Sequence, residues 1–351
     1  MGTSRTNRQP KVEARAAYLV LGMHRSGTSA VTQLLALAGA TLPQNVMPGD
    51  AHNAKGYFEP WKVALFDDER LRASGSAWDD PFAFPFRPLP AAQERRWKAR
   101  AASVLAEEYA AAGWPLIKDP RVTVLLPLWR SVLTKAGLAI RCVVPVRHPL
   151  AVAGSLRRRD GFTDQKSVLV WTSYMLAAEA YTRDLPRAFV DYDALLADWR
   201  GEVRKIEVAH GARLPRLTPK AAAAIDAFLT PELRHNAAEG SLLDLGWAGE
   251  LAAQVHHAFS SANPDTAALD AAAAQLAAWQ DKIGALVSPT ARDLDARRAD
   301  LAEMTRRAEV AESLQIHQRE VLEAGWRKDV GDLREVLGQL STELDNALLD
   351  E

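Results

Sequence analysis

Short apolar runs alternate with helical patterns through most of the chain before residue 216. The runs are nearly free of polar alternation, which is typical of parallel strands that are buried on both faces. Three of them lead through a turn-forming segment into a stretch with an apolar helical face. This alternation predicts an α/β fold, in which helices flank a parallel β-sheet. The apolar runs are residues 17–21, 114–117, 140–146 and 188–190, and the helical patterns are residues 28–37, 150–159 and 194–199.

The last part of the chain has a different pattern. Residues 296–351 are highly charged, and a set of apolar positions recurs three and four residues apart, which indicates a short heptad seam. We therefore predict an α/β domain over residues 15–240 and a helical C-terminal region, a candidate coiled coil, over residues 241–351. The pattern favours packing of this seam within the chain, and a homo-oligomer through the C-terminal helices is the alternative. The C-terminal seam consists of Val330, Leu333, Leu337, Leu340 and Leu344.

Composition sets only broad limits on function. Of the 351 residues, 48% are hydrophobic and 25% are charged, which are ordinary values for a globular protein. The formal net charge of −1 gives no general reason to expect nucleic-acid binding. No apolar stretch reaches the ~18 residues of a membrane span, and residues 1–12 lack the apolar run of a signal peptide. The lack of such a long stretch predicts no transmembrane segment, and the single Cys142 fits a reducing compartment, so we predict a cytoplasmic protein.

The turn between the apolar run of residues 17–21 and the helical pattern of residues 28–37 resembles a phosphate-binding loop in sequence. In GMHRSGTSAV, Gly22 and Gly27 have the spacing of G-x-x-x-x-G-K-[ST], and Ser29 fills the Ser/Thr position. Thr28 stands where an ATPase has the lysine that reaches the β- and γ-phosphates. The N–H groups that begin the next helix still favour a phosphate, and Arg25 adds a permanent positive charge. The loop therefore predicts a nucleotide whose transferred group is not the γ-phosphate.

A second anion-binding segment follows the third apolar run. Arg147 comes directly after residues 140–146, and Ser155 lies eight residues later on the predicted helix, for which Pro149 suits the first position. The carboxyl ends of parallel strands share one edge of the sheet, where open α/β folds bind ligands. A guanidinium and a hydroxyl at that edge can hold a second phosphate. Two phosphate sites without a loop lysine fit a 3′,5′-bisphosphate nucleotide.

Together these segments resemble the sulfotransferases that use 3′-phosphoadenosine 5′-phosphosulfate (PAPS). The 5′-phosphosulfate loop of that family is similar to GMHRSGTSAVTQLL, in the R-S-G-T-S form of bacterial members, and its 3′-phosphate segment is similar to VVPVRHPLAVAGSLRRRDGF. Segments of bacterial sulfotransferase-like proteins also resemble NAKGYFEP, KDPR, DYDALLADW and FLTPELRH, so the resemblance covers roughly residues 17–236. It implies a P-loop-like fold, here with a helical C-terminal extension. The absence of the K-G-x-x-G motif of cytosolic members argues against the small-phenol subgroup.

The resemblance also implies roles for single residues. Glu59 falls where glycan and protein sulfotransferases have a glutamate base, and Lys118 where glycan members have a lysine near the sulfuryl group. With Arg25, Lys118 would stabilise charge on that group, and no metal ion is required. The implied activity is transfer of a sulfuryl group from PAPS to a hydroxyl or amine acceptor, with a saccharide or glycan favoured. The implied nucleotide-binding residues are Arg25, Ser26, Gly27, Thr28 and Ser29 for the 5′-phosphosulfate, and Arg147 and Ser155 for the 3′-phosphate.

Other interpretations stay open. A nucleotide kinase or ATPase with a divergent phosphate loop would need ATP and Mg²⁺, and it is disfavoured by Thr28 and by the lack of a clear aspartate at a strand end. A catalytically idle binding or scaffold protein would keep the fold and use its helical tail for assembly. Single residues have plainer alternatives as well. Glu59 would be solvated if GYFEP were an ordinary turn. Separately, the charge run favours a solvated helix face for residues 157–159, with contact to an anionic acceptor as the alternative.

Overall fold

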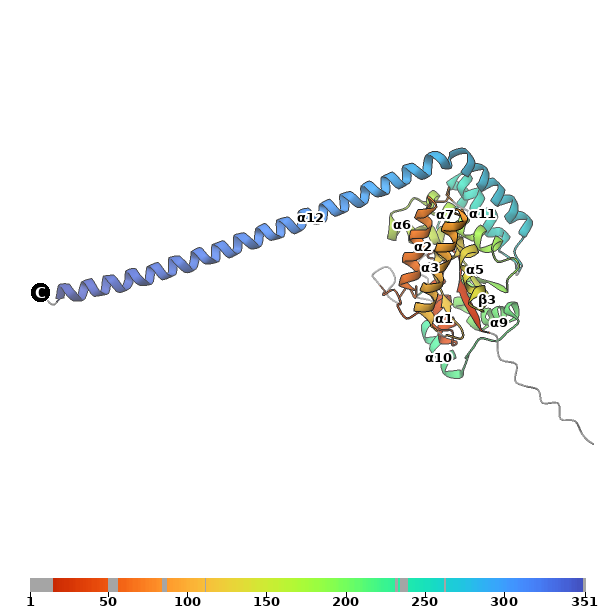
Figure 1. Cartoon of the computed structure of the whole chain (residues 1–351), viewed down its shortest axis with the longest axis horizontal. Helices are drawn as coiled ribbons and strands as arrows, with labels where there is room; N and C mark the ends of the chain where they lie inside the picture. The colour runs from red at the N-terminus through yellow and green to blue at the C-terminus, as the bar shows by residue number, and fades with distance from the viewer. Residues whose placement is uncertain are drawn as a thin grey trace, which may run out of the picture. The chain divides into compact units, whose positions relative to one another are not determined.

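The computed structural model contains one parallel sheet, made of β1 (Ala16–Val20), β2 (Leu116–Ile117), β3 (Ala139–Val146) and β4 (Arg187–Asp191). The spatial order of the strands is β2–β1–β3–β4, and helices cover the sheet (Figure 1). Tyr18 of β1 lies opposite Leu116 of β2 and Arg141 of β3. The predicted parallel α/β fold is confirmed. The structure describes residues 15–49, 56–83, 87–110, 112–230, 233, 239–261 and 263–349, with side chains described as far as residue 342.

Strand β1 is buried on both faces, as its apolar sequence predicts. Tyr18 and Val20 contribute to one hydrophobic cluster, and Ala17 and Leu19 contribute to another. The first cluster includes residues of α1 (Thr28–Leu37), α8 (Tyr192–Ala197), α9 (Trp199–His210) and α10 (Pro219–Phe228). The sheet is therefore the middle of three layers.

The second cluster fills the space between the sheet and the remaining helices. Trp129 and Trp171 are among its fully buried side chains. The helices that contribute to it are α2 (Trp61–Ala73), α3 (Ala91–Tyr109), α4 (Pro120–Val124), α5 (Leu126–Lys135), α6 (Pro149–Asp160), α7 (Asp164–Ala180), α11 (Trp247–Ala258), which follows a short 3₁₀ helix (Leu242–Leu245), and the start of α12 (Thr266–Leu349). Among the described residues, no helix combines the length and the apolar character that crossing a membrane requires.

Most predicted element boundaries agree with the structure. Helix α1 begins at Thr28, and α6 begins at Pro149, whose missing N–H removes no helical hydrogen bond at this position. The predicted helix over residues 194–199 is instead the junction of two helices. The side chain of Asp198 accepts a hydrogen bond of 2.9 Å from the N–H of Gly201 and caps α9, so α8 ends at Ala197.

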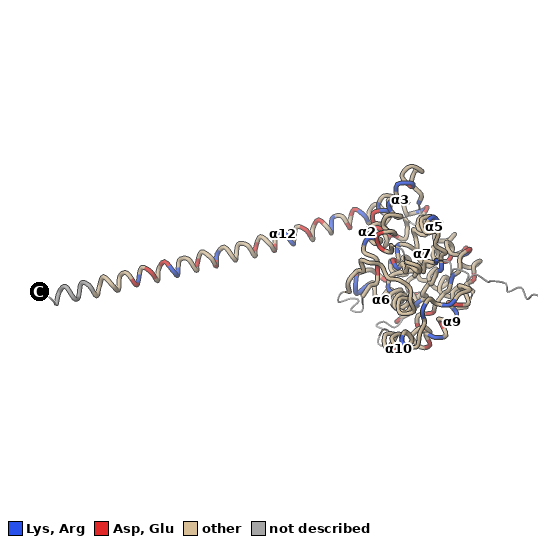
Figure 2. The backbone as a smooth tube through the Cα atoms, turned by 60° about the horizontal axis from the view of Figure 1, so that its bottom comes forward, with Lys and Arg blue, Asp and Glu red and all other residues tan. Residues whose placement is uncertain are grey.

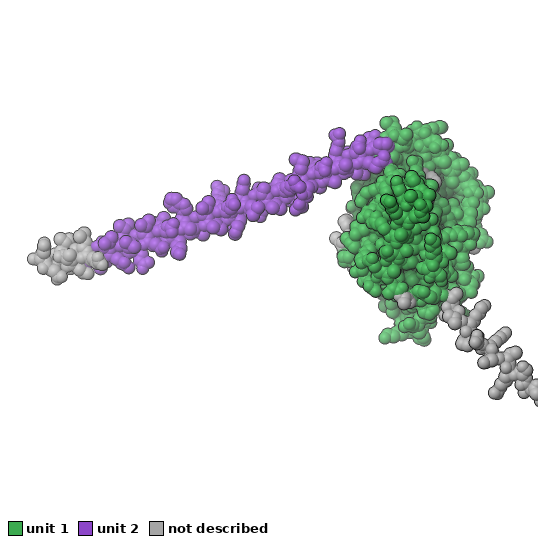
Figure 3. All heavy atoms as spheres, in the orientation of Figure 1, with its two compact units in different colours: residues 1–288 green, residues 289–351 purple. Residues whose placement is uncertain are grey.

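The C-terminal helix leaves its apolar seam exposed. Within the helix itself the described side chains of the C-terminal seam are not covered, since Val330, Leu333, Leu337 and Leu340 are 39% to 64% exposed, and packing of the seam within the chain stays a prediction. The side chain of Leu344 lies outside the described part. The chain divides into two compact units between Ser288 and Pro289 (Figure 3), whereas the predicted domain limit is residue 240.

Candidate functional site

Four segments that follow the strands lie at the carboxyl edge of the sheet. Residues 22–27 come after β1, Lys118 after β2, Arg147 after β3 and Tyr192 after β4. Strands β1 and β3 are neighbours at the centre of the sheet. From β1 the chain goes on to β2 at one edge, and from β3 it goes on to β4 at the opposite edge. Open α/β sheets bind ligands where the connections of two neighbouring strands diverge in this way. The predicted phosphate loop and Arg147 lie on the two sides of this switch point.

The loop has a conformation that few side chains allow. Gly22, Arg25 and Gly27 have positive φ angles of 105°, 66° and 92°. A Cβ atom on Gly27 would lie 2.2 Å from an atom of the Tyr192 ring, so glycine is required there. At the other end, the N–H of Gly22 donates a hydrogen bond of 2.8 Å to Thr123 Oγ1. The turn leads into α1, whose first N–H groups lack helical partners and therefore favour an anion.

Arg25, Arg147 and Ser155 are brought together across the switch point. Arg25 Nε donates to Ser155 Oγ at 2.7 Å, and Arg147 Nη1 donates to the backbone oxygen of Arg25 at 3.0 Å. The guanidinium of Arg147 also lies 4.7 Å from the centroid of the Tyr192 ring, over its face. Burial lowers the pKa of Arg25, but a guanidinium keeps its charge at neutral pH. Two cations and a hydroxyl thus share one largely buried corner of the sheet edge.

Glu59 and Lys118 form a buried ion pair on the β2 side of the loop. Lys118 Nζ lies 2.5 Å from Glu59 Oε1, and it also donates to the backbone oxygen of Tyr57 at 2.9 Å. Ser29 Oγ donates to the same Tyr57 oxygen at 3.4 Å, which connects the pair to the first turn of α1. The alternative of a solvated Glu59 is wrong, because its side chain is only 4% exposed.

The environment of Glu59 favours proton uptake. Burial raises the pKa of this carboxyl above its ordinary value, although the nearby positive charge of Lys118 lowers it in part. A carboxylate with a raised pKa binds a proton more strongly, as a general base at neutral pH must. The pair can therefore accept a proton at Glu59 with the Lys118 ammonium beside it.

The segment KDPR is fixed by hydrogen bonds of its own. The two carboxylate oxygens of Asp119 accept from the N–H and from Nη1 of Arg121, both at 2.8 Å, so Asp119 caps α4. Arg121 Nε donates to Asp68 at 3.0 Å. This network anchors the chain immediately after Lys118 and holds that residue at the sheet edge.

His24 is a residue of the site that the sequence pattern did not select. Its ring centroid lies 4.7 Å from that of Trp78 and 6.3 Å from that of Tyr174. Its Nε2 atom and the Oγ atom of Ser26 are buried, and neither makes a hydrogen bond within the described residues. Burial is the main cause that lowers the pKa of His24 well below its ordinary value, so the ring is neutral at pH 7. Positive charges lower it further, and they belong to Arg159, Arg121, Lys118 and Arg25.

An aromatic and cationic wall adjoins His24. The rings of Trp78 and Phe162 are stacked with centroids 5.7 Å apart, and Arg159 lies over Trp78 at 5.5 Å from the centroid. Lys166 Nζ lies 3.9 Å from the centroid of Phe162. Residues 157–159 are therefore not one solvated face, because the side chain of Arg157 is 60% exposed whereas that of Arg159 is 16% exposed.

The predicted site residues thus all lie in or beside the loop, with Arg147 and Ser155 on one side and Glu59 and Lys118 on the other. Their roles in binding and catalysis stay predictions. Two of the shorter segments similar to sulfotransferases extend beyond what it describes. Residues 53–55 of NAKGYFEP lie outside the described residues, as do residues 231, 232, 234 and 235 of FLTPELRH.

Comparisons with known proteins do not assign the chain to a family. No family model matches it, and no curated protein matches it. Among solved structures, it is similar to the sulfotransferase domain of the olefin synthase from Synechococcus PCC 7002. The TM-score is 0.40 and the identity 17%, over 73% of this chain and 99% of that chain. A likeness this weak carries no weight for function, which must be inferred from the site itself.

Replacing Lys118 by methionine should strongly destabilise the protein. The change leaves Glu59 buried without its cation, and breaking a buried ion pair from one side typically costs about 3–5 kcal/mol. Chemical denaturation at pH 8 measures the loss in the free energy of unfolding. Lys62→Met is the matched control, because it breaks an exposed pair with Glu107, and its effect should be much smaller. Adding Glu59→Leu to Lys118→Met should recover stability. Equal losses of stability in Lys118→Met and Lys62→Met would contradict a buried pair.

Stability should depend on pH through His24. The unfolded chain takes up a proton at this residue near pH 6.5, whereas the folded chain resists protonation to a much lower pH. Its effect is therefore small above about pH 6.5 and grows as the pH falls, to at most about 2 kcal/mol of lost stability at pH 5. The difference between unfolding free energies at pH 8 and pH 5 should be smaller by this amount in His24→Gln. His257→Gln is the control for losing an exposed histidine. If His24→Gln showed the same difference between pH 8 and pH 5 as the wild type, the assignment of this pH dependence to His24 would be wrong.

Proposed function

We propose that the protein is a sulfotransferase that moves a sulfuryl group from PAPS to a hydroxyl or amine acceptor. One observation carries the proposal. The lysine-free phosphate loop is bonded to Arg147 and Ser155 on one side, and on the other side Ser29, just after the loop, donates to the same Tyr57 oxygen as Lys118 of the buried Glu59–Lys118 pair. The first connection supports a nucleotide with two separate phosphates, and the second supplies a base and a cation for the transferred group.

The nucleotide would bind along both sides of the switch point. The N–H groups at the start of α1 suit the 5′-phosphosulfate, and the buried hydroxyl of Ser26 offers a further donor. Arg147 and Ser155 would hold the 3′-phosphate. The bond from Arg25 to Ser155 lies between these two positions. A hydroxyl that accepts one hydrogen bond can still donate its own proton, so Ser155 can bond to Arg25 and to a phosphate oxygen together.

The Glu59–Lys118 pair would serve the chemical step. Glu59 takes the proton of the acceptor hydroxyl as the oxygen forms its bond to sulfur. The bond between sulfur and the bridging phosphate oxygen breaks, and its electron pair leaves with the bisphosphate product. Protonation of Glu59 removes the negative charge that pairs with Lys118, so the ammonium can turn to the sulfuryl oxygens. Stabilising such charge is usually the largest catalytic contribution, and a positioned base adds about 10²–10⁴-fold.

A saccharide or other glycan is the acceptor class that we favour. The wall of Trp78 and Phe162 offers aromatic faces of the kind against which the apolar side of a sugar ring packs. Arg159 and Lys166 lie over these rings, where they pair with Asp160 and Asp79. An acidic substituent would share or replace these partners. A reducing cytoplasmic setting belongs to the same proposal, since the single cysteine, Cys142, is buried and free.

The kinase or ATPase alternative has less support from the same geometry. Asp119 follows β2 and would be a candidate ligand for Mg²⁺, but both of its carboxylate oxygens accept hydrogen bonds from Arg121. Thr28 occupies the position of the lysine that such enzymes use for the γ-phosphate. The idle-module alternative would make Glu59 and Lys118 purely structural.

Label transfer from PAPS tests the proposal. With sulfur-labelled PAPS and a panel of saccharides, we expect transfer by the wild type and a loss of about 10²–10⁴-fold in Glu59→Gln. Glu107→Gln, which changes an exposed glutamate, is the control and should keep wild-type activity. Ligand-dependent unfolding separates the alternatives, because a ligand at 100 times its dissociation constant adds about 2.7 kcal/mol. Stabilisation by ATP with Mg²⁺ and not by 3′-phosphoadenosine 5′-phosphate would favour a kinase, and stabilisation by neither would favour the idle module.

A further inference from the structure

The second compact unit is a helix with an unusually exposed apolar face. Within α12, Leu322 is 66% exposed and Trp326 is 72% exposed, and Leu301 and Met304 are 65% and 67% exposed. Large apolar side chains exposed in this number along one helix indicate an interaction site. Gly325, Gly331 and Gly338 lower the helix propensity of the same stretch. Because most helical stability in proteins comes from packing of an amphipathic face, this helix requires a partner.

Some of the exposed apolar residues follow a coiled-coil repeat, whereas Val310, Leu314, Ile316 and Val321 lie outside its positions a and d. Leu294, Leu301 and Leu322 are separated by multiples of seven residues and define position a, and Met304 lies three residues after Leu301 at position d. From Leu322, the apolar positions continue at Trp326 and then with the C-terminal seam. Between Leu322 and Val330 the repeat is shifted by one residue, since these two positions a are eight residues apart instead of seven. Beyond this shift, Val330 and Leu337 occupy position a, and Leu333 and Leu340 occupy position d.

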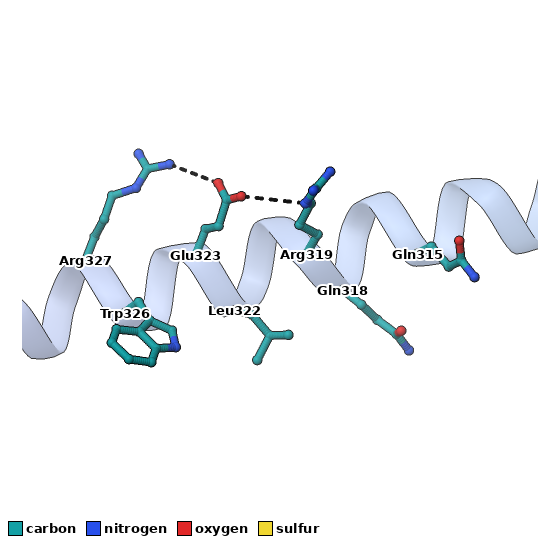
Figure 4. Close-up of a pocket in the computed structure, with 7 residues that line it drawn as sticks. All are labelled: Gln315, Gln318, Arg319, Leu322, Glu323, Trp326 and Arg327. Carbon is teal, nitrogen blue, oxygen red and sulfur yellow. Dashed lines mark hydrogen bonds and ion pairs between the residues drawn. The ribbon is translucent and has the colours of Figure 1, made fainter.

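The surface around Leu322 indicates what covers it. Leu322 and Trp326 project from one side of the helix together with Gln318, whereas Arg319, Glu323 and Arg327 project from the other side (Figure 4). Gln315 and Gln318 line the same hollow as Leu322 and Trp326, and they fall at positions a and d. In a parallel pair in register, each glutamine meets its own copy and can bond to it. Polar residues at such positions fix the register and the number of chains.

The charges that flank the apolar positions match a parallel pair. In that arrangement, a residue at position g of one helix meets the residue five positions later, at position e, of the other. The charged matches in this chain are all of opposite sign: Asp293 with Arg298, Arg307 with Glu312, and Asp329 with Arg334. Figure 2 shows acidic and basic residues interspersed along α12. An antiparallel pair would bring g to g and e to e, and so would not use these matches.

We propose that residues 289–349 form a parallel, in-register, two-stranded coiled coil with a second copy of this chain. Three observations support it independently of any catalytic activity: the apolar repeat, the glutamines within it, and the complementary flanking charges. The pairing would join two sulfotransferase-like units through their C-terminal helices.

Cysteine cross-linking of the full chain tests both pairing and orientation. In a parallel pair in register, the two copies of residue 333 face each other, so oxidised Leu333→Cys should give a disulfide-linked dimer as the main product. Glu335→Cys, two residues away and on the outer side of the helix, is the matched control and should stay unlinked. The native Cys142 is buried and should not contribute to cross-linking. Light scattering should give the mass of two chains for the wild type.

Charge reversal provides a second readout in variants that leave the apolar positions intact. Asp329→Arg should raise the dissociation constant of the dimer by at least about tenfold, because it converts two attractive contacts into repulsive ones. Adding Arg334→Asp should restore wild-type affinity. A monomer at tens of micromolar, a mass other than that of two chains, or equal cross-linking of Leu333→Cys and Glu335→Cys would overturn the proposal.

Discussion

Complete burial of the central strand is the constraint on which the architecture depends. Strand β1 presents apolar side chains to both helical layers, so its backbone groups find their partners in neighbouring strands. Those neighbours, β2 and β3, are parallel to it and lie on its two sides. Every strand therefore ends at the same edge, and the connections diverge where the loop of residues 22–27 meets Arg147. The position of the candidate site follows from this burial before any motif is considered.

The second constraint is electrostatic. A cation that is withdrawn from water must be compensated, and this site compensates several in different ways. Lys118 is paired with Glu59, and Arg121 with Asp119 and Asp68. Arg25 also donates to the hydroxyl of Ser155, and Arg147 to the backbone oxygen of Arg25. His24, among these charges, stays neutral. The arrangement is suited to binding an anionic ligand and to releasing it as another anion.

Local features were predictable from the sequence because their causes are local. The apolar run at residues 17–21, the glycines at 22 and 27 and Pro149 fix strand, loop and helix starts by backbone chemistry alone. The pairing of Glu59 with Lys118 and the contact of His24 with Trp78 join residues far apart in the sequence, so no local pattern could reveal them. The predicted helix over residues 194–199 was wrong for a related reason. An aspartate such as Asp198 can either continue a helix or cap the next one, and the sequence does not show which.

The C-terminal seam was predictable as a pattern but not in its use. The same spacing of Val330, Leu333 and Leu337 suits packing within a chain and pairing between chains, and their exposure shows only that the helix does not cover them itself. The predicted roles of Arg25–Ser29, Arg147 and Ser155 have a similar status. The structure brings these residues together, but their ligand is still a proposal.

Calorimetric titration with 3′-phosphoadenosine 5′-phosphate and with AMP tests the central claim most directly, because the two nucleotides differ only in the 3′-phosphate. We expect the wild type to bind the bisphosphate more tightly by about 10–100-fold, the value of one or two charge-assisted hydrogen bonds. Arg147→Ala should lose this preference, whereas Arg157→Ala, on the exposed part of α6, should keep it. Equal affinity of the wild type for the two nucleotides would contradict a 3′-phosphate site at Arg147 and Ser155.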